Sequence, residues 1–213
     1  MPIYHKDGKT VMLVHIPKTG GTSIEETFRK EGWEESYFNP NAGERHQHAI
    51  FETWSQWDPV QNREIDEIFT VVRNPEERLR SDVRGAHPYP PTMEAYIERL
   101  TSYIHAYKKN PNFRDNHIRP QWEYLPNDGH PATGLSYNDI PIQVYYFDDP
   151  DHRRKILERY NLETKAQDFP WHTGRNDRLS HRTELDDRSL PTTVQRLIYT
   201  TFYYDYQRFD FNL

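Results

Sequence analysis

A turn that could bind a phosphate group lies near the N-terminus of the chain. The segment from His15 to Ser23 (HIPKTGGTS) follows a short apolar run and precedes a predicted helix. Its two glycines allow backbone N–H groups to approach a ligand closely, and the start of a helix adds aligned donors with a partial positive charge. The remaining polar groups of the turn are one cation and three hydroxyls, from Lys18, Thr19, Thr22 and Ser23. Together they predict an anion site, although a glycine turn that only begins a helix is the alternative.

A second turn of the same kind follows the apolar run that ends at Val72 (FTVVRNPEERLRS, residues 69–81). Arg73 would leave the sheet here with a planar guanidinium suited to phosphate. Ser81 comes eight residues later, about two helical turns on, and could add a hydroxyl to the same anion. For Arg78 and Arg80 we expect only ion pairs with Glu76 and Glu77 on a solvated helix face.

The order of these residues argues against a site for ATP or GTP. In such sites the lysine follows the glycines and a hydroxyl holds Mg²⁺, whereas Lys18 precedes Gly20 and Gly21. The second strand also ends in Arg73, where such an enzyme carries an aspartate. The first turn therefore fits a single 5′-phosphate group, with a lysine beside its bridging oxygen.

Strands that alternate with helices would position both turns. Apolar runs predict strands at 11–16, 68–72 and 140–147, and helices are expected at 22–30, 49–57, from 75 onwards, 93–108, 149–160 and 192–206. This alternation predicts an α/β fold with a parallel sheet. Ligands of such sheets bind beyond the carboxyl ends of the strands, which is where both turns lie.

The composition is that of a folded chain of 213 residues, enough for a single domain. Its 15 Tyr and 5 Trp can bury large apolar areas, and a net charge of −6 argues against nucleic acid as a partner. The absence of cysteine excludes disulfides and thiolate chemistry. No apolar run near the N-terminus is long enough for a signal or membrane anchor, so a cytoplasmic protein without a membrane partner is expected.

The two turns resemble the signature motifs of sulfotransferases that depend on 3′-phosphoadenosine 5′-phosphosulfate (PAPS). The resemblance rests on PKTGGTS and VVRNPEERLRS, and later segments are more loosely similar to the carbohydrate and bacterial branch. It implies a P-loop-like three-layer fold over residues 1–213, with a central parallel sheet flanked by helices. It also implies that the 5′-phosphosulfate binds to Lys18, Thr19, Gly20, Gly21, Thr22 and Ser23, and the 3′-phosphate to Arg73 and Ser81. Arg175 would be a third phosphate contact.

The reaction would transfer the sulfuryl group in line from PAPS to a hydroxyl or amine, leaving PAP, without a metal. The base is expected in the segment ERHQHA (residues 44–49), because the spacing of His46 and His48 resembles the histidine pair of uronyl 2-O-sulfotransferases. His48 is the first choice as base, His46 the second and Glu44 the third. The alternative for the two histidines is that they bind a metal ion together. His117 and Gln121 would lie on one face if their segment is helical; they are expected in the acceptor site, with a helix cap or a packing role as the alternative. The acceptor would be a small molecule or a glycan, and the competing functions are a small-molecule kinase and a catalytically inactive nucleotide-binding protein.

Overall fold

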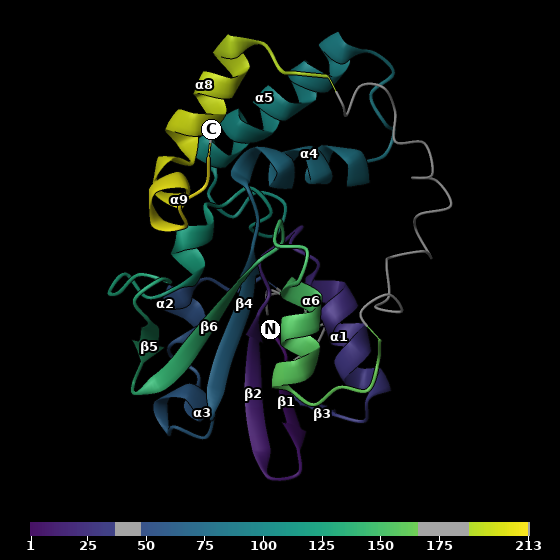
Figure 1. The fold of residues 1–213 in the computed structure, drawn as a ribbon. Helices are drawn as coiled ribbons and strands as arrows, with labels where there is room; N and C mark the ends of the chain where they lie inside the picture. Colours follow the sequence, from purple (N-terminus) through teal and green to yellow (C-terminus); the bar gives the residue numbers. More distant parts are fainter. Residues whose placement is uncertain (37–47, 166–187, 213) are drawn as a thin grey trace.

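A six-stranded sheet forms the centre of the computed structural model, which describes residues 1–36, 48–165 and 188–212 (Figure 1). The strands lie in the order β3-β1-β2-β4-β6-β5. Their bounds are β1 (Ile3–Lys6), β2 (Lys9–Val14), β3 (Glu34–Ser36), β4 (Glu67–Val72), β5 (Leu135–Tyr137) and β6 (Ile140–Tyr146).

The middle of the sheet is parallel, as the sequence predicts. Strand β2 pairs with β4 and β4 with β6, both in parallel, and all six residues of β4 are buried. The edges differ from the prediction, because β1 and β3 lie antiparallel on one side and β5 lies antiparallel on the other. These three strands have only three or four residues each, too few for a clear alternating pattern. The sheet is therefore mixed.

Helices cover both faces of the sheet (Figure 1). On one face α1 (Gly21–Lys30) and α6 (His152–Arg159) pack against Val11, Leu13 and Phe69. On the other face α2 (Phe51–Trp54), α3 (Asp58–Gln61) and the 3-10 helix η1 (Gln121–Tyr124) cover Met12, Val14 and Ile68. Successive residues of β2 thus point to opposite cores, as expected for a strand buried on both sides.

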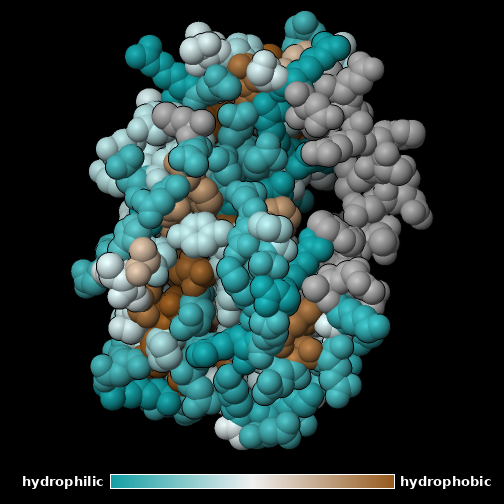
Figure 2. Space-filling model, viewed as in Figure 1, coloured by the Kyte–Doolittle hydropathy of each residue, from teal (hydrophilic) through white to brown (hydrophobic). Residues whose placement is uncertain are grey.

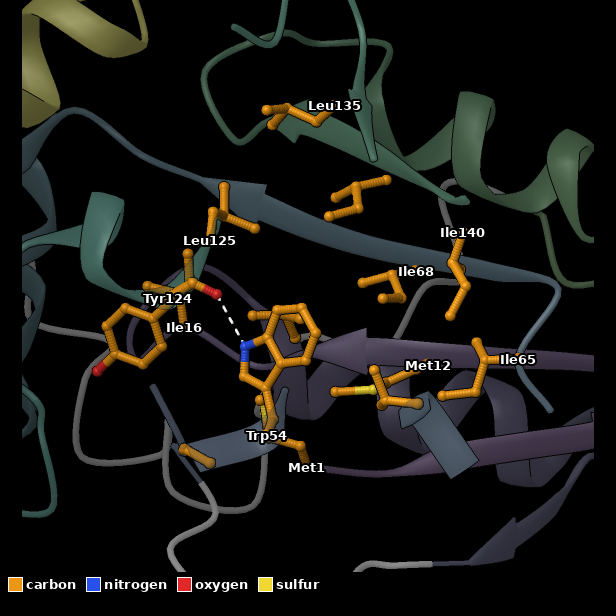
Figure 3. Packing of buried hydrophobic residues seen from close by; sticks show 14 of the residues in the cluster. Met1, Met12, Ile16, Trp54, Ile65, Ile68, Tyr124, Leu125, Leu135 and Ile140 are labelled. Atoms are coloured by element: carbon orange, nitrogen blue, oxygen red, sulfur yellow. Dashed lines mark hydrogen bonds between the residues drawn. The ribbon is translucent and has the colours of Figure 1, made fainter. Parts of the chain in front are cut away.

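The second of these cores is organised around Trp54, which is fully buried among side chains from both sheet and helices (Figure 3). Its indole N–H donates a hydrogen bond to the carbonyl of Tyr124 at 2.9 Å. A large aromatic side chain with its polar atom satisfied in this way stabilises a core and fixes the position of its neighbours. The bond attaches α2 to η1, which lies next to the functional site.

A third core joins four helices beyond the carboxyl end of β4: α4 (Pro75–Gly85), α5 (Met93–Lys109), α8 (Thr192–Thr201) and α9 (Tyr203–Arg208) (Figure 1). The expected helix at 192–206 is divided at Phe202, whose φ of −108° and ψ of 24° leave the helical region. Phe202 and Tyr206 are buried in this core, whereas Tyr203 and Tyr204 are exposed. The helix expected at 49–57 is likewise replaced by the shorter α2 and α3.

The face shown in Figure 2 is mostly hydrophilic, with apolar side chains visible in places over the half that contains the sheet. In the described part of the chain, no helix has both the length and the apolar character to cross a membrane.

Candidate active site

The first turn begins where β2 ends and carries two left-handed residues. Lys18 has a φ of 66° and Gly20 a φ of 88°. A side chain on Gly20 would also be crowded, since its Cβ would lie 3.3 Å from the ring of Phe147. Helix α1 starts at Gly21 without a side-chain cap. The N–H of Ser23 already donates to the carbonyl of Gly20 at 3.1 Å, so the N–H groups of Gly21 and Thr22 are the ones left for an anion.

Gly21 is required by a neighbouring histidine. A Cβ at this position would lie 2.3 Å from Cδ2 and 2.4 Å from Nε2 of His15. The ring of His15 is buried, and its Nδ1 lies 2.5 Å from Oε1 of Glu25. His15 therefore packs directly against the turn and supports it. Glu25 is buried in this contact.

The hydroxyl groups of the turn are not equally available. The hydroxyl of Thr19 is buried and donates to the carbonyl of Ile16 at 2.8 Å, so it closes the turn. Ser23 is buried and Thr22 is half-buried. The backbone of the turn, Lys18 and Thr22 are consequently the groups best placed to meet a ligand.

Arg73 reaches this turn from the neighbouring strand. One guanidinium nitrogen, Nη1, donates to the carbonyl of Lys18 at 3.3 Å, and Nη2 lies 3.5 Å from a carboxylate oxygen of Glu77. The guanidinium stacks on Phe147 at 4.3 Å from the ring centre. Its Nε is buried and has no hydrogen-bond partner within the described residues. Lys18, Arg73 and Phe147 thus meet at the carboxyl ends of β2, β4 and β6, as the parallel registers require.

Gln121 holds the backbone of Arg73. It is fully buried; its side-chain carbonyl accepts from the N–H of Arg73 at 2.9 Å, and its amide donates to the carbonyl of Arg73 at 2.7 Å. Asp205, whose pKa burial raises to about 6, accepts from the N–H of Gln121. This arrangement differs from the expected acceptor contact, because a fully buried amide with both ends engaged supports Arg73 instead. Nor does Gln121 share one helix with His117, since a turn and Pro120 separate them.

One face of α4 lies over the first turn. Glu77 contacts Arg73, and the Cβ position of Gly85 lies 3.1 Å from Nζ of Lys18. Ser81, which is half-buried, is one helical turn from each of these residues and so shares their face. The helical spacing therefore places Ser81 on the face of α4 that carries these two contacts. Arg84 approaches the same region, because its charge acts on both Lys18 and Arg73.

The charges around Lys18 favour an anion. Burial lowers the pKa of its ammonium; Asp82 opposes this effect, whereas Arg73, Arg84 and Arg114 lower the pKa further. Burial likewise lowers the pKa of Arg73 to about 10, with Arg84 as the next cause. Several partly desolvated cations close together repel one another, and a bound anion would relieve that repulsion.

The other two arginines of α4 correct a prediction. Arg80 pairs with Glu76 at 2.8 Å as expected, but its side chain is only 4% exposed. Arg78 is 2% exposed and donates to the carbonyls of His117 and Arg119 at 2.9 and 2.6 Å. Neither lies on a solvated face: Arg78 is covered by the loop that it bonds and by the ring of Phe202, and Arg80 also donates to the carbonyl of Arg188. Arg78 instead fixes the loop that carries His117.

Three histidines form a row beside the first turn. The ring of His48 lies 4.9 Å from that of His15 on one side and 4.9 Å from that of His117 on the other, edge to face in both cases. His48 is 6% exposed, and its Nδ1 lies 2.9 Å from a carboxylate oxygen of Asp115. Burial lowers the pKa of His48 to about 4, although the hydrogen bond with Asp115 raises it. His48 is therefore neutral near pH 7 and available as a proton acceptor.

His117 is more accessible than His48 and belongs to a second charged pair. Its side chain is 25% exposed, and Nδ1 lies 2.7 Å from Asp82, which also pairs with Arg114 at 3.2 Å. Burial alone would raise the pKa of Asp82, but the hydrogen bond and charge of His117 lower it overall, with Arg114 and Lys18 contributing. An acceptor hydroxyl that reached His48 would lie next to His117.

Other predicted site residues, Glu44, His46 and Arg175, lie outside the described residues. Within the described ranges, no three or more His, Asp or Glu residues are grouped so as to hold a metal ion. Sequence reasoning missed Asp82, Arg84, Arg114, Asp115 and Phe147. The helical spacing from Ser81 could have indicated Arg84, whereas no local pattern marks Asp115, which reaches His48 from 67 residues away.

A glycine turn with a lysine, an arginine from the next strand and a buried histidine cluster define a site for transfer of an anionic group. The model of the sulfotransferase family matches residues 2–212, and the chain therefore belongs to the sulfotransferase family. No match was found among curated proteins or among solved structures.

Proposed function

We propose that the protein transfers the sulfuryl group of PAPS to a hydroxyl of a small-molecule or glycan acceptor. The observation that carries this proposal is the meeting of Lys18 and Arg73 over an uncapped helix start, with Nε of Arg73 buried and unpartnered within the described residues. Membership of the sulfotransferase family supports it. The glycine turn between strand and helix corresponds to a P-loop-like fold without the lysine position of an ATP site.

The residues present fit a PAPS molecule. In the proposed mode, Lys18 and the N–H groups of the turn hold the 5′-phosphosulfate, whereas Arg73 and Ser81 hold the 3′-phosphate. The chemistry that PAPS supplies when bound is an activated sulfuryl group with a phosphate as leaving group. Lys18 stabilises the negative charge that develops on that leaving oxygen, because a preorganised cation in a partly buried site costs no reorganisation during the reaction.

His48 is the proposed base. Its Nδ1 faces Asp115, which leaves Nε2 to accept the proton of the acceptor hydroxyl. His117 lies beside it and is proposed to contact the acceptor. No metal takes part in the proposed mechanism.

The function is tested by transfer assays with PAPS carrying labelled sulfur and a mixture of phenol, alcohol and sugar acceptors. A parallel reaction contains ATP with Mg²⁺ and labelled γ-phosphate. We expect transfer from PAPS only, and a loss of at least about 100-fold in the Lys18→Ala variant, the scale of removing one oxyanion-stabilising group. Transfer from ATP alone would favour a kinase. Binding of PAP without transfer to any acceptor would favour an inactive nucleotide-binding protein.

A further inference from the structure

The loop that carries Asp115 has an unusual backbone. Three consecutive residues, Arg114, Asp115 and Asn116, have left-handed conformations with φ of 54°, 51° and 64°. None of them is a glycine, and this region is sparsely populated by other residues. Such conformations persist where the surroundings fix them, and they cluster at functional sites. The contacts of this loop therefore indicate which function its conformation serves.

Those contacts are directed at His48. The side-chain amide of Asn116 donates to the carbonyl of His48 at 2.8 Å, and the carbonyl of Asn116 accepts from the hydroxyl of Tyr124 at 2.7 Å. The next residue toward the N-terminus, Asp115, places a carboxylate oxygen 2.9 Å and its backbone carbonyl 3.2 Å from Nδ1 of His48. One loop thus holds both the backbone and the ring of His48.

We propose that Asp115 is the positioning residue of the base His48, keeping the proton of the imidazole on Nδ1 and Nε2 free. This inference rests on the proposed sulfuryl transfer. In that step the acceptor O–H bond breaks and its proton moves to Nε2 of His48. A bond forms between the acceptor oxygen and sulfur, and the bond between sulfur and the phosphate oxygen of PAPS breaks, releasing PAP. Asp115 stays ionised and stabilises the imidazolium.

The other two histidines of the row provide the comparison. Each also has a carboxylate at Nδ1, Glu25 for His15 and Asp82 for His117. His15 has no space for a substrate, because its Nε2 lies 2.4 Å from the Cβ position of Gly21. His117 is exposed enough to meet an acceptor, so the pair His117–Asp82 is the matched control for His48–Asp115.

Several charged groups face His48 and act on its titration. Asp115 favours the protonated form, whereas burial, His15 and His117 disfavour it. Glu25 is paired with His15, and Asp82 is paired with His117. The amino group of Met1, whose pKa burial lowers to about 6, lies in the fields of Glu25 and Asp115. Removal of the Asp115 charge should therefore lower the pKa of His48 below its value of about 4 in the wild type.

The tautomer of His48 can be measured without donor or acceptor, by nitrogen-15 NMR of the imidazole in the wild type, Asp115→Asn and Asp82→Asn. We expect the proton on Nδ1 of His48 in the wild type and in Asp82→Asn. In Asp115→Asn the two tautomers should mix and the pKa should fall. A proton on Nε2 of His48 in the wild type, or an unchanged spectrum in Asp115→Asn, would overturn the proposal whatever the protein transfers.

The second readout is the rate of transfer at saturating PAPS between pH 4 and 8. Asp115→Asn should lower kcat by about tenfold to a hundredfold, no more than the lower end of the roughly 100- to 10,000-fold that general base catalysis contributes, while the affinity for PAP stays unchanged. In a His48→Ala background the same change should have no further effect, because two residues that act through one group are not additive. Additive losses, or an unchanged kcat in Asp115→Asn, would reject Asp115 as the positioning residue of His48. A wild type that does not bind PAP, or that does not transfer the sulfuryl group, would instead contradict the proposed function.

Discussion

Replacement of Gln121 by Met separates the two roles that this residue could have. The amide of Gln121 makes two hydrogen bonds to the backbone of Arg73, at 2.9 and 2.7 Å, in a fully buried position. Methionine has a similar length and no hydrogen-bonding amide. The variant therefore leaves the N–H and carbonyl of Arg73 without these partners, with little change in packing.

The size of the effect follows from those two bonds. A hydrogen bond contributes about 0.5–1.5 kcal/mol net, so the free energy of unfolding should fall by about 1–3 kcal/mol. In a chain of this length 1 kcal/mol corresponds to about 2–4 °C in Tm, and we expect a decrease of about 2–12 °C. If about 1 kcal/mol of this free energy is lost from the contact between the Arg73 guanidinium and PAP, PAP should bind about fivefold more weakly.

The assay measures Tm, the Kd for PAP by calorimetry, and the KM for an acceptor at saturating PAPS. The control is Gln61→Met, since Gln61 bonds the carbonyl of Ser55 and has no contact with Arg73. We expect weaker PAP binding only for Gln121→Met, with an unchanged acceptor KM. A raised acceptor KM with normal PAP affinity would refute this reasoning and restore Gln121 to the acceptor site.

Three further outcomes are expected. Gly21→Ala should destabilise the fold by about 1–3 kcal/mol in denaturant titrations, because its Cβ would clash with His15 at 2.3 Å; equal stability would show that His15 moves freely. Arg84→Ala should weaken PAP binding about threefold to tenfold at low salt and less at high salt, and a loss independent of salt would contradict an electrostatic role. The pKa of Asp205 is raised to about 6 by burial, above about 4 in the unfolded chain. Its contribution to stability therefore falls as pH rises from about 4 to 6. Asp205→Asn should remove that decline. An unchanged slope of the free energy of unfolding against pH in this variant would contradict the role of Asp205.

The turns at the carboxyl ends of the strands could be predicted from the sequence because their signals are local. A β-branched run followed by glycines or by Arg73 indicates a buried strand and the turn that ends it. The parallel centre of the sheet then brings Lys18 and Arg73 together, and the helical spacing brings Ser81 to the same face. His48 lies between the two turns in the sequence, and the structure places it beside the first turn, next to His15.

Residues that act across long distances in sequence could not be predicted in this way. Gln121 and Asp115 lie 48 and 67 residues from the groups they hold, and neither stands in a pattern of its own. Arg78 was expected on a solvated face in an ion pair with Glu76 or Glu77, but it is buried and donates to the carbonyls of His117 and Arg119. Tertiary packing decides these cases, and local charge patterns contain no information about it.

The central claim is that the two turns bind a nucleotide with both a 5′- and a 3′-phosphate. The most direct measurement is calorimetric titration of the wild type and Arg73→Ala with PAP and with adenosine 5′-monophosphate, which lacks the 3′-phosphate. We expect the wild type to bind PAP more tightly than the monophosphate, and Arg73→Ala to lose most of this difference while its binding of the monophosphate changes little. Equal affinity of the wild type for both nucleotides, or a preference for PAP that survives Arg73→Ala, would contradict it.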